Sequence, residues 1–77
     1  MYMYSEYKTT DIVLAAFLKV NGVSMSQIEK VGQRGTFVFT DVDSELLSAY
    51  DLGNATVEPV AFNNSIKQLT TSVRRID

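Results

Sequence analysis

Alternating apolar and polar side chains predict one clear β-strand, over residues 36–40. Phe37 and Phe39 fall on one face of that strand, and the polar and β-branched residues between them fall on the other. A preceding strand over residues 27–31 is expected to pair with it. Glycines at both ends of residues 32–35 are typical of a four-residue hairpin turn, which would join the two strands.

The first of three helical patterns covers residues 12–20 and is apolar on nearly every side. Thr9 or Thr10 is the expected N-cap, and Asn21-Gly22 is a typical stop. We expect one side to face the core, formed by Ile12, Leu14, Ala15 and Leu18. Val13 and Phe17 remain for a second contact, which a swapped tail, a dimer partner or the last helix could supply.

A second, short helix is predicted after the central strand, within residues 41–50. Asp41 or Asp43 would cap it, because a carboxylate accepts hydrogen bonds from the free amides of a first helical turn. Residues 55–58 are expected to form a short third strand. Pro59 would end that strand, since proline has no amide hydrogen for a sheet ladder.

The last helix has the clearest amphipathic pattern in the chain and is predicted from about Pro59 to Arg75 or Ile76. Its apolar stripe consists of Phe62, Ile66, Leu69, Val73 and Ile76. The predicted element order is therefore α-β-β-α-β-α. The corresponding fold class is α+β, a small antiparallel sheet of a hairpin and a third strand, packed with two to three helices.

Residues 1–8 leave two alternatives open, a tail that packs its tyrosines on the body of the protein or a short edge strand. The tail is the favoured alternative. Tyr2 and Tyr4 would lie on one side of an extended segment. The whole chain, residues 1–77, is expected to form one small domain. A chain of this length buries only roughly 60–65% of its surface on folding, so a dimer interface would add stability.

The composition excludes several types of catalytic and metal-binding site. The chain has no cysteine and no histidine, so it lacks thiolate nucleophiles, the commonest zinc ligands and the usual general base at neutral pH. No phosphate-binding glycine loop or dinucleotide motif is present. Asp41, Asp43 and Glu45 match the first, third and fifth positions of an EF-hand calcium loop. Leucines occupy the sixth and twelfth positions of that loop, where glycine and glutamate are needed. We therefore expect no enzymatic activity, no cofactor and no metal site.

Several segments resemble a family of small uncharacterised domains found in bacteria and bacteriophages. The resemblance begins with residues 7–11, continues through residues 14–18 and Gly22, and resumes at residues 37–41. It ends with residues 57–59 and Phe62 before the last helix, and covers residues 7 to about 73 in all. It implies a phage or mobile-element origin and assigns no activity or catalytic residue.

The favoured function is a non-enzymatic protein-binding module that can also self-associate, whose interface would include Tyr2, Tyr4, Val13 and Phe17. The alternative is a small nucleic-acid-associated regulator that uses a basic C-terminal helix, with contacts from Arg34, Lys67, Arg74 and Arg75. A net charge of −2 and a pI near 4.9 make nucleic acid the second choice. A cytoplasmic location without membrane insertion is expected, because the longest apolar run, residues 12–18, is too short to span a bilayer.

Overall fold

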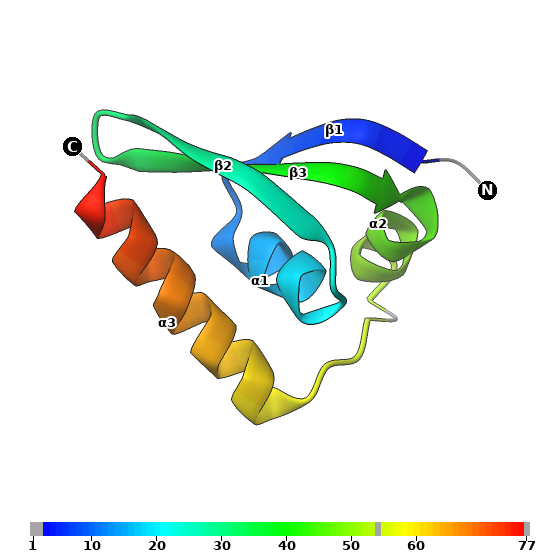
Figure 1. Cartoon of the computed structure of the whole chain (residues 1–77). Coiled ribbons are helices and arrows are strands. Elements are labelled where there is room, and N and C mark those ends of the chain that lie inside the picture. The colour runs from blue at the N-terminus through cyan, green and yellow to red at the C-terminus, as the bar shows by residue number, and fades with distance from the viewer. Residues whose placement is uncertain (1–2, 54, 77) are drawn as a thin grey trace.

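The computed structural model describes residues 3–53 and 55–76, which form a three-stranded sheet and three helices in the order β-α-β-β-α-α (Figure 1). The elements in chain order are β1 (Met3–Thr9), α1 (Ile12–Val20), β2 (Ser24–Val31), β3 (Arg34–Asp43), α2 (Ser44–Asp51) and α3 (Pro59–Arg75). The fold is α+β with a small antiparallel sheet, as the sequence predicts, but the order of the elements differs from the predicted one.

Strand β3 is the centre of the sheet, because both other strands pair with it in antiparallel orientation. Phe39 stands opposite Tyr7 on β1 and Met25 on β2. This register places Phe39 on the same face as two partly buried side chains that pack on the core. The long apolar strand that stands out in the sequence is thus the element to which the rest of the sheet is added.

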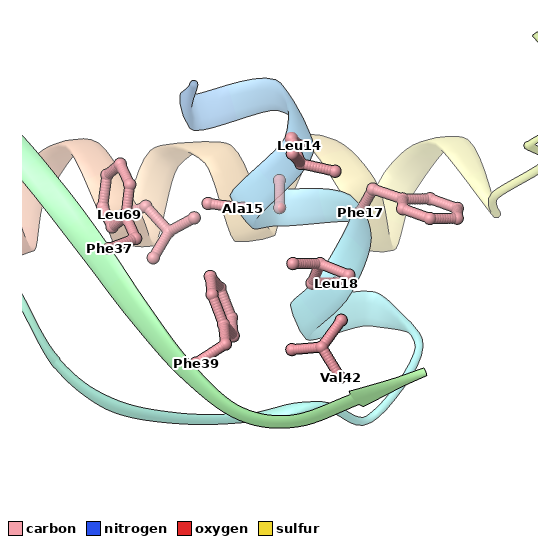
Figure 2. Packing of buried hydrophobic residues seen from close by; sticks show 9 residues of the cluster. Leu14, Ala15, Phe17, Leu18, Phe37, Phe39, Val42 and Leu69 are labelled. Atoms are coloured by element: carbon pink, nitrogen blue, oxygen red, sulfur yellow. The ribbon is translucent and has the colours of Figure 1, made fainter. Parts of the chain in front are cut away.

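The core lies between this face of the sheet and helix α1 (Figure 2). Phe39 lies close to Leu18, and Phe37 lies beside Leu69 of α3. The largest fully buried side chains are Phe37, Phe39, Leu18, Leu69, Val38 and Val42. Because the strand alternates, covering one face of β3 with α1 and α3 buries both phenylalanines at once.

The opposite face of the sheet is polar, yet Val38 on that face is almost fully buried. Lys8 and Gln27 are its neighbours on β1 and β2. The Lys8 ammonium reaches across β3 to Glu29, with 3.6 Å between Nζ and Oε1, and the Gln27 amide donates to the same carboxylate at 2.9 Å. Long polar side chains therefore cover Val38 without a second layer of helices.

Asp41 interrupts the alternation of β3. Its φ is +56°, which is uncommon for a residue with a side chain. Phe39 and Val42 are three residues apart, yet both join the core, which a regular strand would not allow. The left-handed residue between them changes the side-chain phase, so that Val42 turns inward next to Leu18 (Figure 2).

The N-terminal segment and the predicted third strand exchange roles. Residues 3–8 belong to edge strand β1, the second of the two alternatives that the sequence left open. Residues 55–58 form no strand, so the predicted third strand is wrong. Because β1 and β2 already flank β3, no edge of β3 remains for that segment. It instead links α2 to α3, with Ala55 and Val57 packed on the core.

Two predicted boundaries are also corrected. Asp11 caps α1 in place of Thr9 or Thr10, because β1 continues to Thr9 and the chain must turn before the helix. The hairpin turn has two residues instead of four, since Val31 pairs with Arg34. Gly32, with φ of +64°, takes the first turn position, as in a type II′ hairpin.

The helix predictions for the C-terminal half are confirmed. Asp43 caps α2 by accepting a hydrogen bond from the Glu45 amide at 2.9 Å. Helix α3 begins at Pro59, and Glu58 accepts from the Ala61 amide at its cap. Leu69, from the predicted apolar stripe, is buried in the core.

Most of helix α1 is covered within the chain itself, and Val13 is the exposed exception among its large apolar residues. All five residues from Leu14 to Leu18 are buried, with the sheet, α3 and α2 around them. Phe17 points away from Phe39 (Figure 2). Its ring meets that of Tyr50 on α2, with 5.7 Å between the centroids. The second contact expected for Phe17 is therefore α2, and no swapped tail or partner is needed to bury it.

Candidate binding surface

The close approach of α3 to the β2–β3 hairpin creates one of the two surfaces on which cations gather. Gly35 on β3 has no side chain, and the methyl groups of Val73 occupy the space where a Cβ would be. At the same place the Lys30 ammonium donates to the Ile76 carbonyl at 3.0 Å. These contacts fix the C-terminal end of α3 against the hairpin.

This docking brings Arg34 and Arg74 to one hollow of about 210 Å³, which we call the hairpin hollow. Its apolar lining comes from Ile12, Phe37 and Val73. Arg34 starts β3 and Arg74 lies in the last turn of α3, forty positions later in the sequence. Two of the four predicted nucleic-acid contacts are therefore neighbours in the folded chain.

Lys67 and Arg75, the other two predicted contacts, line a separate groove of about 420 Å³ between α3 and α1. Lys19 of α1 contributes a third cation, and among residues 3–53 and 55–76 no carboxylate lines this groove. The remaining lining residues are polar: Gln68, Thr71 and Ser72. We call this surface the basic groove. Sequence reasoning missed Lys19, because only the packing of α1 against α3 brings it to the same place.

Helix dipoles explain some of these cations and leave others unexplained. Lys19 occupies the last turn of α1, and Arg74 and Arg75 occupy the last turn of α3, where a positive charge is favourable. Lys67 lies in the middle of α3, and Arg34 lies on a strand, so this argument does not apply to either. The helix dipole therefore does not account for Lys67 and Arg34 lying beside the other cations.

Four of the nine acidic residues gather away from these cations. Asp41 and Asp43 end β3, and Glu45 and Asp51 belong to α2, which lies at the end of the molecule opposite the C-terminus of α3 (Figure 1). Within residues 3–53 and 55–76, the one ion pair joins Lys8 to Glu29, on the outer face of the sheet. The cations of the basic groove and of the hairpin hollow thus keep their charge available for a ligand.

The four residues predicted for an apolar interface differ in exposure. Tyr2 lies outside the described residues. Phe17 is only 4% exposed, so it cannot serve as a docking residue. Tyr4 is 38% exposed, with its ring 5.8 Å from that of Tyr7, and Val13 is 41% exposed. The other large exposed apolar residues, Val31, Leu52 and Val60, lie on other parts of the chain.

The carboxylate best held in place is that of Asp11, and its role is structural. Oδ1 accepts hydrogen bonds from the amides of Val13 and Leu14, at 2.9 and 3.3 Å. Oδ2 accepts from the Tyr50 hydroxyl at 3.1 Å, which ties α2 to the start of α1. Burial raises the pKa of Tyr50 above its usual 10.0, and the bond to the Asp11 carboxylate raises that pKa further.

Among the described residues, no group of three carboxylates is placed to hold a metal ion. Over the same residues, no helix has the length and apolar character that crossing a membrane requires. What the described surface offers is positive charge on both sides of the C-terminal half of α3.

Comparison with known proteins gives a family and no closer relative. No curated protein and no solved structure matches the chain significantly. Residues 4–74 match a domain of unknown function, DUF5659. This match spans β1 through nearly the whole of α3, and so covers both the sheet and the basic groove. The chain therefore belongs to the DUF5659 family.

Proposed function

We propose that this domain is a non-enzymatic binding module that holds nucleic acid through phosphate contacts in the basic groove. One observation carries the proposal: Lys19, Lys67 and Arg75, from two helices, line one groove in which the described part of the chain places no carboxylate. Phosphate groups are the dominant contacts in nucleic-acid binding, and lysine and arginine are their usual partners. The hydroxyl and amide groups in the same groove add neutral donors for phosphate oxygens.

Spacing along α3 supports the same ligand. Lys67 and Arg75 are two helical turns apart and on one side of the helix, with Thr71 between them. At 1.5 Å per residue, about 12 Å of helix separates the two cations. An extended polyanion can contact both, whereas a single small anion cannot. The overall charge of −2 does not oppose this, because exposed charges farther away than about 8–10 Å are largely screened in physiological salt.

Neutralising single lysines tests the proposal. Lys67→Gln removes one charge from the groove, and Lys8→Gln removes one charge from the outer face of the sheet, so both variants have the same net charge. The assay is fluorescence anisotropy with labelled single- and double-stranded oligonucleotides over a range of salt. We expect Lys67→Gln to weaken binding and to lower the salt slope by about 0.7–0.9. Lys8→Gln should leave both unchanged.

Equal effects of the two variants would refute the groove as the contact surface. Absence of any binding by the unaltered protein at low salt would refute the proposed function altogether.

Docking on another protein is the second candidate, and it rests on the exposed side chains of Tyr4 and Val13. A self-associating module of this kind would place them in a homodimer interface. Sedimentation of the protein and of a Val13→Ser variant tests it: a dimer that dissociates in the variant supports this candidate, and a monomer in both contradicts the self-associating form. The resemblance to bacterial and phage domains supports a cytoplasmic accessory factor of a phage or mobile element as the setting for either activity.

A further inference from the structure

The hairpin hollow combines an apolar interior with positive charge at its exposed positions. Phe37 is buried, and Ile12 and Val73 are partly buried, while Arg34 and Arg74 are exposed. The apolar groups therefore lie deeper than the guanidinium groups. A volume of about 210 Å³ is smaller than the roughly 300–1,000 Å³ of a pocket for a drug-sized ligand, so it suits a single ring system.

None of the described carboxylates lines this hollow. Asp11 is adjacent in sequence to two of its lining residues, Thr10 and Ile12, but the Asp11 carboxylate is occupied by the α1 amides and by the Tyr50 hydroxyl. Both guanidinium groups therefore lack an internal counter-ion among the described residues. A ligand that fills the hollow completely must supply an apolar flat part and a negative charge.

The geometry points to a nucleotide unit as the occupant of the hairpin hollow, with its base on the apolar lining and its phosphate between Arg34 and Arg74. Guanidinium groups bind phosphate oxygens in pairs and also stack on base rings, so two arginines suit both parts of the ligand. A base inside a duplex is not accessible to such a hollow. We therefore expect the nucleotide to be an unpaired one within a single strand, an expectation that rests on the proposed function. A free mononucleotide has the same chemistry and is the other source to be tested.

The two surfaces are compatible with one strand. Thr70, Val73 and Arg74 line the hollow, and Lys67, Thr71 and Arg75 line the groove, so both surfaces share the C-terminal half of α3. A strand whose backbone lies in the groove could turn one base around the helix into the hollow. Single-strand binders combine a cationic track with apolar contacts to individual bases in this way.

Filling the hollow provides the test. Thr70→Leu places a larger side chain in it with a residue that helices favour, and Asn64→Leu makes a comparable change at an exposed position of α3 outside both surfaces. Arg34→Gln is a second variant that adds no bulk. Circular dichroism melting confirms that each variant folds.

The binding probes are a single-stranded oligonucleotide, the same strand with abasic sites, and adenosine monophosphate. We expect Thr70→Leu and Arg34→Gln each to weaken oligonucleotide binding at least tenfold, and Asn64→Leu to have no effect. The abasic strand should bind as weakly to the unaltered protein as the intact strand binds to Thr70→Leu. Equal affinity for intact and abasic strands, or equal behaviour of Thr70→Leu and Asn64→Leu, would overturn the inference.

Failure of the inference and failure of the proposed function give different results. If Lys67→Gln weakens strand binding while Thr70→Leu does not, the groove stands and the hollow is refuted. If no strand binds, adenosine monophosphate decides the question by nuclear magnetic resonance. A shift of the Gly35 amide that Thr70→Leu abolishes supports a free nucleotide as the ligand, and its absence refutes the nucleotide site.

Discussion

Replacing Gly35 by alanine should test the contact that brings the hairpin and α3 together. A Cβ at this position would lie 2.7 Å from Cγ2 and 3.1 Å from Cγ1 of Val73, closer than packed carbon atoms approach. Overpacking of this kind costs about 1–3 kcal/mol. Alanine also restricts the unfolded chain, and this offsets about 0.5–1 kcal/mol of the overpacking cost. The offset applies because the φ of Gly35 is not positive, so alanine can adopt the native backbone conformation. The expected net loss of stability is roughly 0.5–2 kcal/mol.

The sign of this effect should reverse when Val73 is also alanine. Val73→Ala removes both methyl groups that a new Cβ would meet, and the remaining Cβ lies at 3.5 Å, an ordinary contact. In that background Gly35→Ala should be neutral or stabilising by about 0.5–1 kcal/mol. The interaction energy in the double-mutant cycle is then about 1–3 kcal/mol.

Urea unfolding of the four proteins measures this cycle through the midpoint and the slope m. Val60→Ala serves as the control background, because Val60 lies on the same helix but is mostly exposed. Gly35→Ala should cost as much there as in the unaltered protein. If its cost is the same in the Val73→Ala background as well, the packing of α3 on the hairpin is not as described.

Three further changes have defined outcomes. Ser65 is 7% exposed, and its hydroxyl has no hydrogen-bond partner among the described residues. Ser65→Ala should therefore raise the stability by about 1 kcal/mol, seen as a rise of about 4–8 °C in Tm; a lower Tm would contradict this. Tyr50→Phe should cost about 0.5–1.5 kcal/mol at pH 7. Because the folded-state pKa of Tyr50 is raised, the difference in stability between the unaltered protein and Tyr50→Phe persists below pH 10 and shrinks as pH rises through the folded-state pKa. Urea unfolding at pH 7 and pH 11 measures this difference. A difference that stays constant or grows would refute the assignment. Asp43→Ala should cost about 0.5–2 kcal/mol through loss of the α2 cap, measured by thermal unfolding, and an unchanged Tm would show that Asp43 is not the effective cap.

Local patterns determined the helices and the central strand, because each of these elements depends on residues that are close in sequence. The apolar stripe and Pro59 set α3, and the alternation around Phe37 and Phe39 marks β3. Asp43 was one of two caps that the sequence allowed, and the φ of Asp41 excludes it from that role by placing it in a left-handed bend of the strand.

Features that depend on pairing between distant segments were decided only by the tertiary structure. Residues 3–9 and residues 55–58 both resemble weak strands, and the choice between them depended on which could reach the free edge of β3. The docking of Phe17 on Tyr50 likewise could not be read from α1, because its partner lies on a helix more than thirty residues away.

The same division holds for the candidate binding surface. Sequence alone identified Arg34, Lys67, Arg74 and Arg75 as cations without assigned partners, since charge and helical spacing are local properties. Their separation into a groove with Lys19 and a hollow lined by Ile12 and Phe37 follows from the packing of α3 on α1 and on the hairpin. That packing depends on Gly35 having no side chain where Val73 approaches, a fit between residues 38 positions apart that no local pattern records.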